Sequence, residues 1–318
     1  MSVPIPAPNP RHSNNNRGIA ATSVSTRVRK LVLEPRMNLT VESVFADACN
    51  VVAPDGQRYS LVSSTIGDGP LNVVLNRHEP FSVIEIGDPV VSDNRGLLVG
   101  RGWRIELSRA KSWDPVPRYD RLAAWPQVVR DNIAWLIGRV APRSPLMETP
   151  EQDVFLAGAF GSRPSDTAMQ GRARQAIQAL LTAHQRRDVY RIKTAARRLA
   201  GLGPGLTPSG DDWLAGWLVG LRVGNTIDKP DGPDRLPIEL VGKAVLQGAS
   251  NQTTELSLAF LAAAADGALS QAWHSLIDAL SNADSVPIRS AAGQVLSVGA
   301  TSGADMLAGF LAAFDAAG

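Results

Sequence analysis

The sequence has a single cysteine, Cys49, among its 318 residues, and its four histidines are far apart. One cysteine excludes a disulfide framework and a cysteine-rich zinc or iron–sulfur site, and is typical of proteins of the reducing cytoplasm. No apolar run approaches the ~18 residues that a membrane-spanning helix needs. We therefore expect a cytoplasmic protein without a membrane partner, and we expect no resident cofactor.

Aromatic residues are also few, at 5% with only three tyrosines, and the net charge is just +2. The first 30 residues contain five basic residues and no acid, so the remaining 288 residues carry a charge of −3. A protein that binds a phosphate backbone needs a basic folded surface, and single-stranded nucleic acid also needs aromatic stacking platforms. Nucleic acid is therefore not an expected partner.

What the sequence does contain is typical of a soluble globular protein, with 44% apolar and 19% charged residues. Its length allows roughly two domains. Residues 1–30 combine four prolines, a Ser-Asn-Asn-Asn run and scattered arginines, a composition that predicts a disordered tail. They lack the apolar core of a secretory signal.

Residues 31–115 have the pattern of a β-rich domain, with β-branched runs broken by turn dipeptides such as Gly87-Asp88. About seven short strands at this spacing predict a small β-barrel or sandwich. The expected strands are 41–45, 50–53, 59–62, 71–75, 81–86, 97–99 and 103–107.

From residue 116 to residue 318 the apolar residues recur at helical spacing. We expect a mainly α-helical domain and hence an α+β chain. The expected helices are 121–140, 165–187, 189–200, 211–224, 238–248, 254–266, 269–281, 286–297 and 303–316.

Residues 201–212 place four glycines, two prolines, two hydroxyls and two carboxylates directly before an apolar helical stripe. A glycine-rich loop that leads into a helix start predicts an anion site, because the first N–H groups are unpaired there and the helix dipole is positive. Ser209 and Asp212 also resemble a capping box, so a purely structural cap is the alternative. The glycines and prolines before Ser209 exceed what a cap needs, which favours a binding or catalytic loop.

A second copy of this pattern occurs 93 residues later. Residues 209–218 and 302–311 share the pattern Ser-Gly-x-Asp-x-Leu-Ala-Gly-x-Leu. The repeat predicts two helix starts that face each other, with Gly216 and Gly309 allowing the helices to cross closely; a duplicated helical hairpin kept only for packing is the alternative. Between the copies, residues 248–255 form a third polar helix start, whose hydroxyls and amide suit a carbonyl or ureido group.

These segments supply the candidate site residues. The candidate catalytic residues are the aspartates Asp211, Asp212 and Asp305, which are also the carboxylates that Mg²⁺ would use if the site held a metal. The candidate substrate-binding residues are Gly205, Thr207, Ser209, Gly210, Asn251, Thr253, Thr254, Ser302 and Gly303.

Three segments together resemble the DUF2877 family, which includes the AllH subunit of oxamate carbamoyltransferase from allantoin catabolism. The segments are residues 203–212, residues 299–309 and the Asn-Gln-Thr-Thr run at 251–254, with a weaker echo at 69–72. The resemblance covers about residues 30–318. It implies a cytoplasmic protein of nitrogen metabolism that acts on a small ureido or amide metabolite together with partner subunits. In that family context, oxalurate and phosphate interconvert with oxamate and carbamoyl phosphate.

The leading hypothesis is therefore a carbamoyltransferase-type enzyme or enzyme subunit. A noncatalytic binding or scaffold subunit is an alternative, because the motif has no neighbouring histidine or lysine that would serve as a base. A stand-alone amide or ureido hydrolase with an aspartate-activated water is a third reading. Homo-oligomers are compatible with all three.

Overall fold

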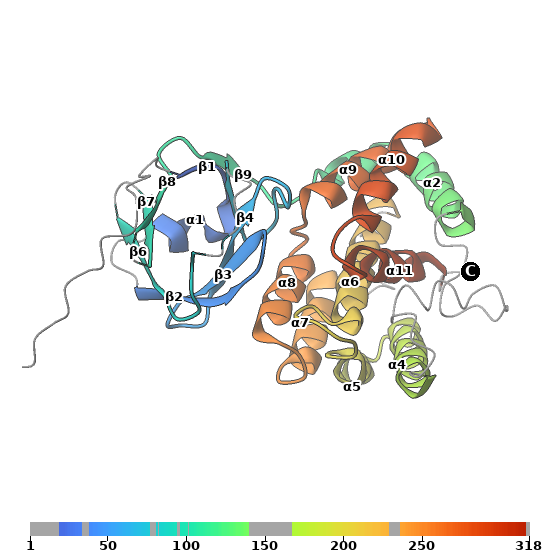
Figure 1. The fold of residues 1–318 in the computed structure, drawn as a ribbon. Coiled ribbons are helices and arrows are strands. Elements are labelled where there is room, and N and C mark those ends of the chain that lie inside the picture. The colour runs from blue at the N-terminus through green and yellow to red at the C-terminus, as the bar shows by residue number, and fades with distance from the viewer. Residues whose placement is uncertain are drawn as a thin grey trace, which may run out of the picture.

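The computed structural model describes residues 19–33, 38–76, 81, 83–93, 96–100, 102–139, 167–228 and 236–315. The described part is an eight-stranded mixed β-barrel followed by a helical region (Figure 1). The predicted α+β architecture is confirmed, and of the two β folds expected the barrel is the one found.

The barrel closes because its first strand pairs with both ends of the sheet. β1 (Ile19–Ser25) runs antiparallel to β5 (Asn72–Leu75) and parallel to β8 (Trp103–Glu106). The order around the barrel is then β5, β4 (Arg58–Ser63), β3 (Ala48–Val52), β2 (Asn38–Val44), β6 (Pro89–Asp93), β7 (Gly96–Val99), β8 and β1. A ninth strand, β9 (Lys111–Trp113), pairs with β1 outside this ring.

The interior of the barrel is apolar. In α1 (Thr26–Leu33), Val28, Leu31 and Val32 lie at helical spacing and are buried in the same core cluster as Val51 and Leu61 of the strands. Figure 1 looks along the barrel and shows α1 within the ring of strands. The barrel therefore has a packed core, to which α1 contributes one face.

The first strand begins nearer the start of the sequence than expected. Residues 19–30, expected in the tail, form β1 and most of α1, and residues 1–18 lie outside the described residues. Burial alternates over residues 19–22, where Ile19 and Ala21 face the core, and residues 23–25 are all buried. The arginines on both sides of this short strand dominate the composition, which is why the sequence did not indicate it. The strand expected at 81–86 is also wrong: the described residues there form turns, and the strand begins at Pro89.

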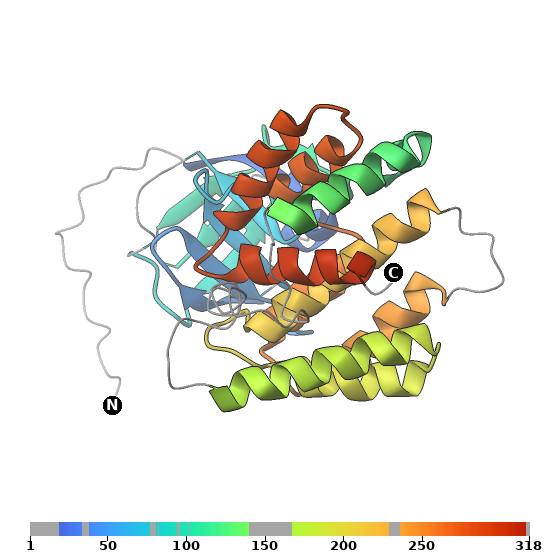
Figure 2. The same cartoon turned by 90° about the vertical axis from the view of Figure 1, so that its right-hand side faces the viewer.

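The helices match the expected ranges closely. After the 3₁₀ turn η1 (Tyr119–Ala124) come α2 (Pro126–Arg139), α4 (Thr167–Gln185), α5 (Val189–Leu199), α6 (Ser209–Ile227), α7 (Ile238–Ala249), α8 (Glu255–Ala265), α9 (Gln271–Leu280), α10 (Ser285–Leu296) and α11 (Ser302–Asp315). Figure 2 shows α6 and α11 crossing at the centre of the helical region, with α4 and α5 on one side and α2 and α10 on the other. None of the helices within the described ranges is long and apolar enough to cross a membrane.

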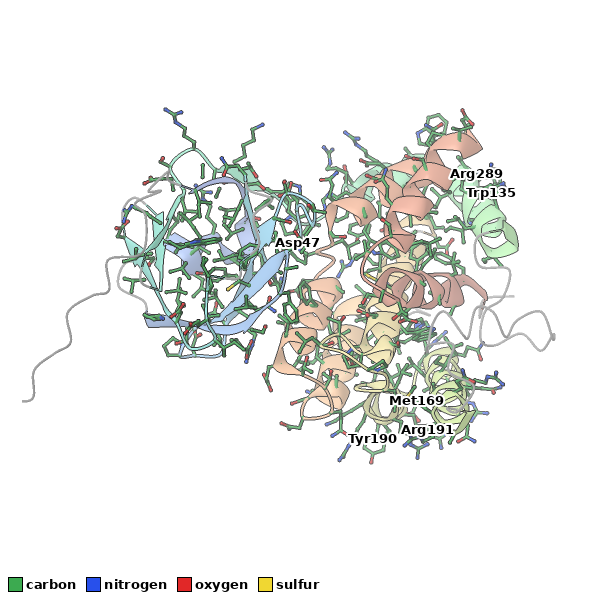
Figure 3. The ribbon with its side chains drawn as sticks, viewed as in Figure 1. Asp47, Trp135, Met169, Tyr190, Arg191 and Arg289 are labelled. Carbon is green, nitrogen blue, oxygen red and sulfur yellow. The ribbon has the colours of Figure 1, made fainter. Side chains whose placement is uncertain are left out.

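The barrel and the helical region meet along α8 and the segment after it. Ala259 and Phe260 of α8 pack against the barrel core. The Gln271 N–H donates to the Asp68 carbonyl at 2.9 Å, and the Leu269 N–H donates to the Pro115 carbonyl at 2.7 Å. Figure 3 shows Asp47 on the side of the barrel nearest the helices. Trp135 and Arg289 lie at the far side of the helical region. The Arg289 guanidinium is 5.8 Å from the centre of the Trp135 ring.

Candidate functional site

The starts of α6 and α11 meet because glycine lets the two helices cross in backbone contact. A Cβ atom on Gly216 would lie 1.8 Å from the Met306 carbonyl oxygen, and one on Gly309 would lie 1.9 Å from the Trp213 carbonyl oxygen. Any side chain at either position forces the helices apart, since real contacts of this kind are never that short. The two glycines therefore set the distance between the helices.

The contacts at this crossing are reciprocal. Trp213 and Met306 are equivalent positions in the two ten-residue segments, which are 93 positions apart, and so are Gly216 and Gly309. Gly216 lies against the carbonyl of Met306, three residues before Gly309, and Gly309 lies against the carbonyl of Trp213, three residues before Gly216. The two ten-residue segments therefore contact each other at one crossing, and an internal repeat of the structure stays a prediction.

The crossing brings two hydroxyls from distant parts of the sequence together. The Thr207 Oγ1 and Ser302 Oγ atoms are 3.1 Å apart and share a hydrogen bond. Thr207 lies in the loop before α6, and Ser302 is the first residue of α11. The expectation that the two segments face each other at one place is thus met by the geometry of this pair.

Two aspartates lie beside these hydroxyls. Burial raises the pKa of Asp305 to about 8, and the charge of Asp212 adds to the rise. Burial likewise raises the pKa of Asp212 to about 7, with a further contribution from Asp211. Burial is thus the main cause for both carboxyls, and it favours their protonated forms near neutral pH.

Three oxygen atoms of this pair lack hydrogen-bond partners among the described residues. They are Asp212 Oδ2, Asp305 Oδ1 and Asp305 Oδ2, all buried, and Asp305 as a whole is 1% exposed. The hydroxyls of Ser209 and Thr301 approach Asp305 closely enough to oppose the rise of its pKa, but neither completes a hydrogen bond to it. Buried acceptors without donors cost about 1–3 kcal/mol each, so these oxygens are an unusual feature that packing alone does not explain.

Asp211 has the opposite character, because its carboxylate is fully engaged by the protein. It is 2% exposed and accepts hydrogen bonds from the Gly201 N–H at 3.1 Å, the Ser257 hydroxyl at 2.8 Å and the Thr253 hydroxyl. Burial raises its pKa, and these three donors oppose the rise. Asp211 ties the loop before α6 to the turn before α8, and its catalytic role stays a prediction.

The glycine-rich loop takes conformations that favour glycine. Gly203 has a φ of +117°, and a Cβ there would lie 2.7 Å from the Ser209 backbone nitrogen. Gly205 has a φ of +96° and is exposed, with open space where a side chain would be. The two positions therefore differ: Gly203 permits the loop to fold against α6, whereas Gly205 leaves the backbone open to a ligand.

Comparison with known protein families gives matches to both parts of the chain. Residues 199–314, which contain both helix starts, match the family model described as oxamate carbamoyltransferase subunit AllH. Residues 20–112, which form the barrel, match the AllH family N-terminal domain. The chain belongs to the AllH family. No solved structure matches it.

The N-terminal match begins at residue 20, so the AllH family domain includes β1, which we expected to be part of a tail. The matches leave out residues 113–198, which contain α2, α4 and α5. The predicted resemblance to this family is confirmed, and the matched part begins ten residues before the expected residue 30.

The predicted anion site at the helix starts of this AllH family member is mostly occupied by the protein itself. In α6 the Gly210 N–H donates to the Leu202 carbonyl at 2.8 Å, and the N–H groups of Asp211 and Asp212 both donate to the Pro208 carbonyl. In α11 the Gly303 N–H donates to the Val298 carbonyl at 3.0 Å. Gly210 and Gly303 serve close packing too, because a Cβ on either would collide with the carbonyl of Leu199 or Val295. These amides are not open to an anion.

The third polar segment, residues 251–254, lies against the glycine-rich loop. None of the hydrogen bonds that its side chains make within the described residues goes to Asp212 or Asp305. The Thr254 hydroxyl donates to the Leu206 carbonyl at 2.6 Å and also accepts from the Ser257 N–H, which caps α8. Asn251 has a φ of +62° and is exposed, and none of the hydrogen bonds of the described residues involves its side chain. Of this segment, Thr253 and Thr254 hold the loop in place, whereas Asn251 makes a turn.

Magnesium at the three aspartates stays a possibility raised by the sequence, and no finding on the described residues tests it. Within them, no group of three or more histidine, cysteine, aspartate or glutamate side chains is placed to hold a metal ion. Asp211 is committed to hydroxyl and amide donors, which leaves Asp212 and Asp305 as a pair.

Three residues of the site escaped the sequence reasoning. Gly201, Ser257 and Thr301 contact the carboxylates, but only proximity in space reveals it. Ser257 gives the clearest signal in retrospect, because a serine that is 2% exposed in an otherwise apolar helix needs a buried partner.

Proposed function

We propose that this chain binds the small amide or ureido substrate of an oxamate carbamoyltransferase at the aspartate pair of the α6–α11 crossing. The observation that carries the proposal is the set of unpartnered buried oxygens on Asp212 and Asp305. Oxamate offers two amide N–H donors and oxalurate offers ureido N–H donors, and these are the groups that such acceptors need. The hydroxyls of Thr207 and Ser302 share a hydrogen bond beside the pair, and both lower the pKa of Asp212.

The pair also suits the proton transfer that carbamoyl transfer requires. When the amide nitrogen of oxamate bonds to the carbonyl carbon of carbamoyl phosphate, the bond from that carbon to the phosphate oxygen breaks and the nitrogen loses a proton. A carboxylate whose pKa lies near 7, as that of Asp212 does, is matched to accepting this proton at neutral pH. In the reverse direction the same group returns the proton to the leaving nitrogen.

One observation favours the second candidate, a binding subunit without the full catalytic apparatus. The amides of Gly210, Asp211 and Asp212 are used by backbone carbonyls, so they do not stabilise a phosphate or an oxyanion. Carbamoyl phosphate then needs its cationic donors from another part of the enzyme. The family description as a subunit supports partner chains as their source.

Calorimetry and thermal shift with oxamate, oxalurate, carbamoyl phosphate and phosphate test the proposal. A ligand at 100 times its dissociation constant stabilises the fold by ~2.7 kcal/mol. We expect oxamate or oxalurate to bind the wild type, and Asp212→Asn and Asp305→Asn to weaken binding at least tenfold. Asp131→Asn, an exposed aspartate on α2, is the matched control and should bind normally.

No heat and no shift with any of the four compounds, even with partner subunits present, would contradict the proposal. Turnover of the assembled enzyme separates the two candidates. A loss of two or more orders of magnitude in kcat for Asp212→Asn, with folding and assembly preserved, supports a catalytic role. Nearly unchanged turnover supports the binding or scaffold role.

A further inference from the structure

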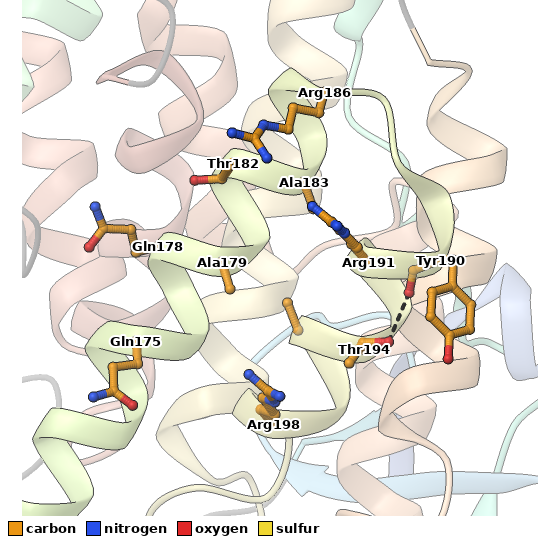
Figure 4. Close-up of a pocket in the computed structure, with 11 residues that line it drawn as sticks. Gln175, Gln178, Ala179, Thr182, Ala183, Arg186, Tyr190, Arg191, Thr194 and Arg198 are labelled. Atoms are coloured by element: carbon orange, nitrogen blue, oxygen red, sulfur yellow. Dashed lines mark hydrogen bonds between the residues drawn. The ribbon is translucent and has the colours of Figure 1, made fainter.

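A groove of about 530 Å³ lies between α4 and α5, outside the segments that match the AllH family (Figure 4). Arg186, Arg191 and Arg198 line it, and the small side chains of Ala179, Ala183 and Ala195 leave it hollow. Figure 4 shows Arg186 directly after the end of α4 and the other two arginines on α5. The groove therefore has cationic walls and an apolar floor.

The charge around this groove is unlike that of the rest of the chain. Residues 167–200 contain eight basic residues and one acid, a net charge of +7, although the whole chain carries only +2. The one acid, Asp188, pairs with Arg191 at 3.2 Å. The hairpin thus presents a concentration of positive charge, and the described residues supply no carboxylate partner for Arg186 or Arg198.

The spacing of the arginines indicates the shape of the occupant. Arg191 and Arg198 are seven residues apart on one helix, which is about 10 Å, or two turns. The floor between them accepts small apolar groups, since Ala183 and Ala195 are buried. An amphipathic helix with acidic residues seven positions apart and an apolar residue between them matches both features.

We propose that this groove docks an acidic helix of a partner subunit in the assembled enzyme. That the occupant belongs to a partner subunit rests on the proposed function. That the occupant is acidic rests only on the arginines of the groove. A small anion is a poorer match, because the three arginines are exposed and the groove is open rather than enclosed. Nucleic acid is a poorer match, because Tyr190 is the single aromatic side chain that lines the groove.

The first test uses the full chain, tagged and co-produced with its partner subunits. The variant Arg186→Glu/Arg191→Glu/Arg198→Glu is compared with Arg109→Glu/Lys111→Glu/Arg118→Glu, which changes the charge equally on exposed residues near the barrel. Size-exclusion chromatography with light scattering gives the mass of each assembly. We expect the control to assemble normally and the groove variant to weaken assembly at least tenfold, with an interaction that also weakens as salt is raised.

The second test identifies the occupant. Because Cys49 is fully buried, a cysteine introduced as Thr182→Cys is the accessible thiol for benzophenone maleimide. After illumination of the assembly, mass spectrometry should find the crosslink on an acidic helical segment of another subunit. The same label at Lys111→Cys should give no such crosslink.

Several results would overturn the inference. They are equal assembly of the two triple variants, a nuclease-sensitive crosslink, a crosslink to a second copy of this chain, or a wild-type chain that purifies alone. The outcome is separable from that of the proposed function, because Asp212→Asn should assemble normally while losing ligand binding. If Asp212→Asn assembles but loses ligand binding, and the triple arginine variant also assembles normally, then the docking groove is contradicted while the proposed function is supported.

Discussion

The Thr207 and Ser302 hydroxyls are 3.1 Å apart although 95 positions separate them in the sequence. Their contact follows from the crossing of α6 and α11, which Gly216 and Gly309 hold in backbone contact. The same crossing buries Asp212 and Asp305 together, each with its pKa well above the usual value. The candidate site is thus a product of helix packing rather than of one loop.

The crossing makes a direct prediction about stability. Gly216→Ala or Gly309→Ala places a methyl group less than 2 Å from a carbonyl oxygen, and the helices must separate. We expect each variant to lose ~3 kcal/mol or more of the free energy of unfolding, measured by urea denaturation.

Gly293→Ala is the matched control, because this α10 glycine has open space around its Cβ position. Alanine there should raise stability by ~0.5–1 kcal/mol, since glycine is a poor helix former. Equal effects of the alanine substitutions at 216 and 293 would contradict the packing argument.

The pH dependence of stability should reveal the aspartate pair. The pKa of Asp305 is about 8 in the folded chain, against an ordinary value of 3.8. The folded state therefore holds this proton more tightly, so its contribution to stability is fully present below about pH 4 and is lost as the pH rises through 8. The free energy of unfolding should fall by up to ~1.4 kcal/mol per pH unit from this group within that window.

Asp305→Asn removes this titration, so its stability profile should be flatter and it should be more stable than the wild type at pH 8. Denaturation at pH 5, 6.5 and 8 measures the difference, with Asp131→Asn retaining the wild-type slope. Parallel profiles for the wild type and Asp305→Asn would show that this carboxyl is not perturbed.

Asp211 should respond in the opposite way to the same change. In Asp211→Asn an amide group replaces one of the oxygens that accept from Gly201, Thr253 and Ser257, so a buried network is broken. We expect a loss of ~2–4 kcal/mol in the free energy of unfolding. A loss below ~0.5 kcal/mol would mean that the hydrogen bonds to Asp211 do not hold the loop.

Cys49 should be inert in the native chain. Burial raises the pKa of its thiol to about 12, and the charge of Asp88 adds to the rise, so little thiolate exists at pH 8. Iodoacetamide should label it only after unfolding in urea, as mass spectrometry would report. Rapid labelling of the folded protein would contradict the packed barrel core.

The helices after residue 116 were predictable because each carries its own periodic apolar stripe and local start signals. The helix predicted at 254–266 and found at Glu255–Ala265 is an example, where Thr254 caps the first turn through the Ser257 N–H. β1 was not predictable in this way, because its short strand is stabilised by pairing with β5 and β8, far along the chain. The expected strand at 81–86 failed for the same reason: β-branched residues there are apolar enough for a strand, but the neighbouring strand pairs with residues 89–91 instead.

The sequence by itself determined which residues are chemically able to form the site, since both helix-start segments and their aspartates are visible in the repeated pattern. Only the tertiary structure decided which aspartate is available, because Asp211 receives three donors while Asp212 and Asp305 retain unpartnered oxygens. It also decided that the helix-start amides are used by backbone carbonyls. Hydrogen-bond partners that lie 40 or more positions away depend on how helices pack, and helix packing is not a local property of the sequence.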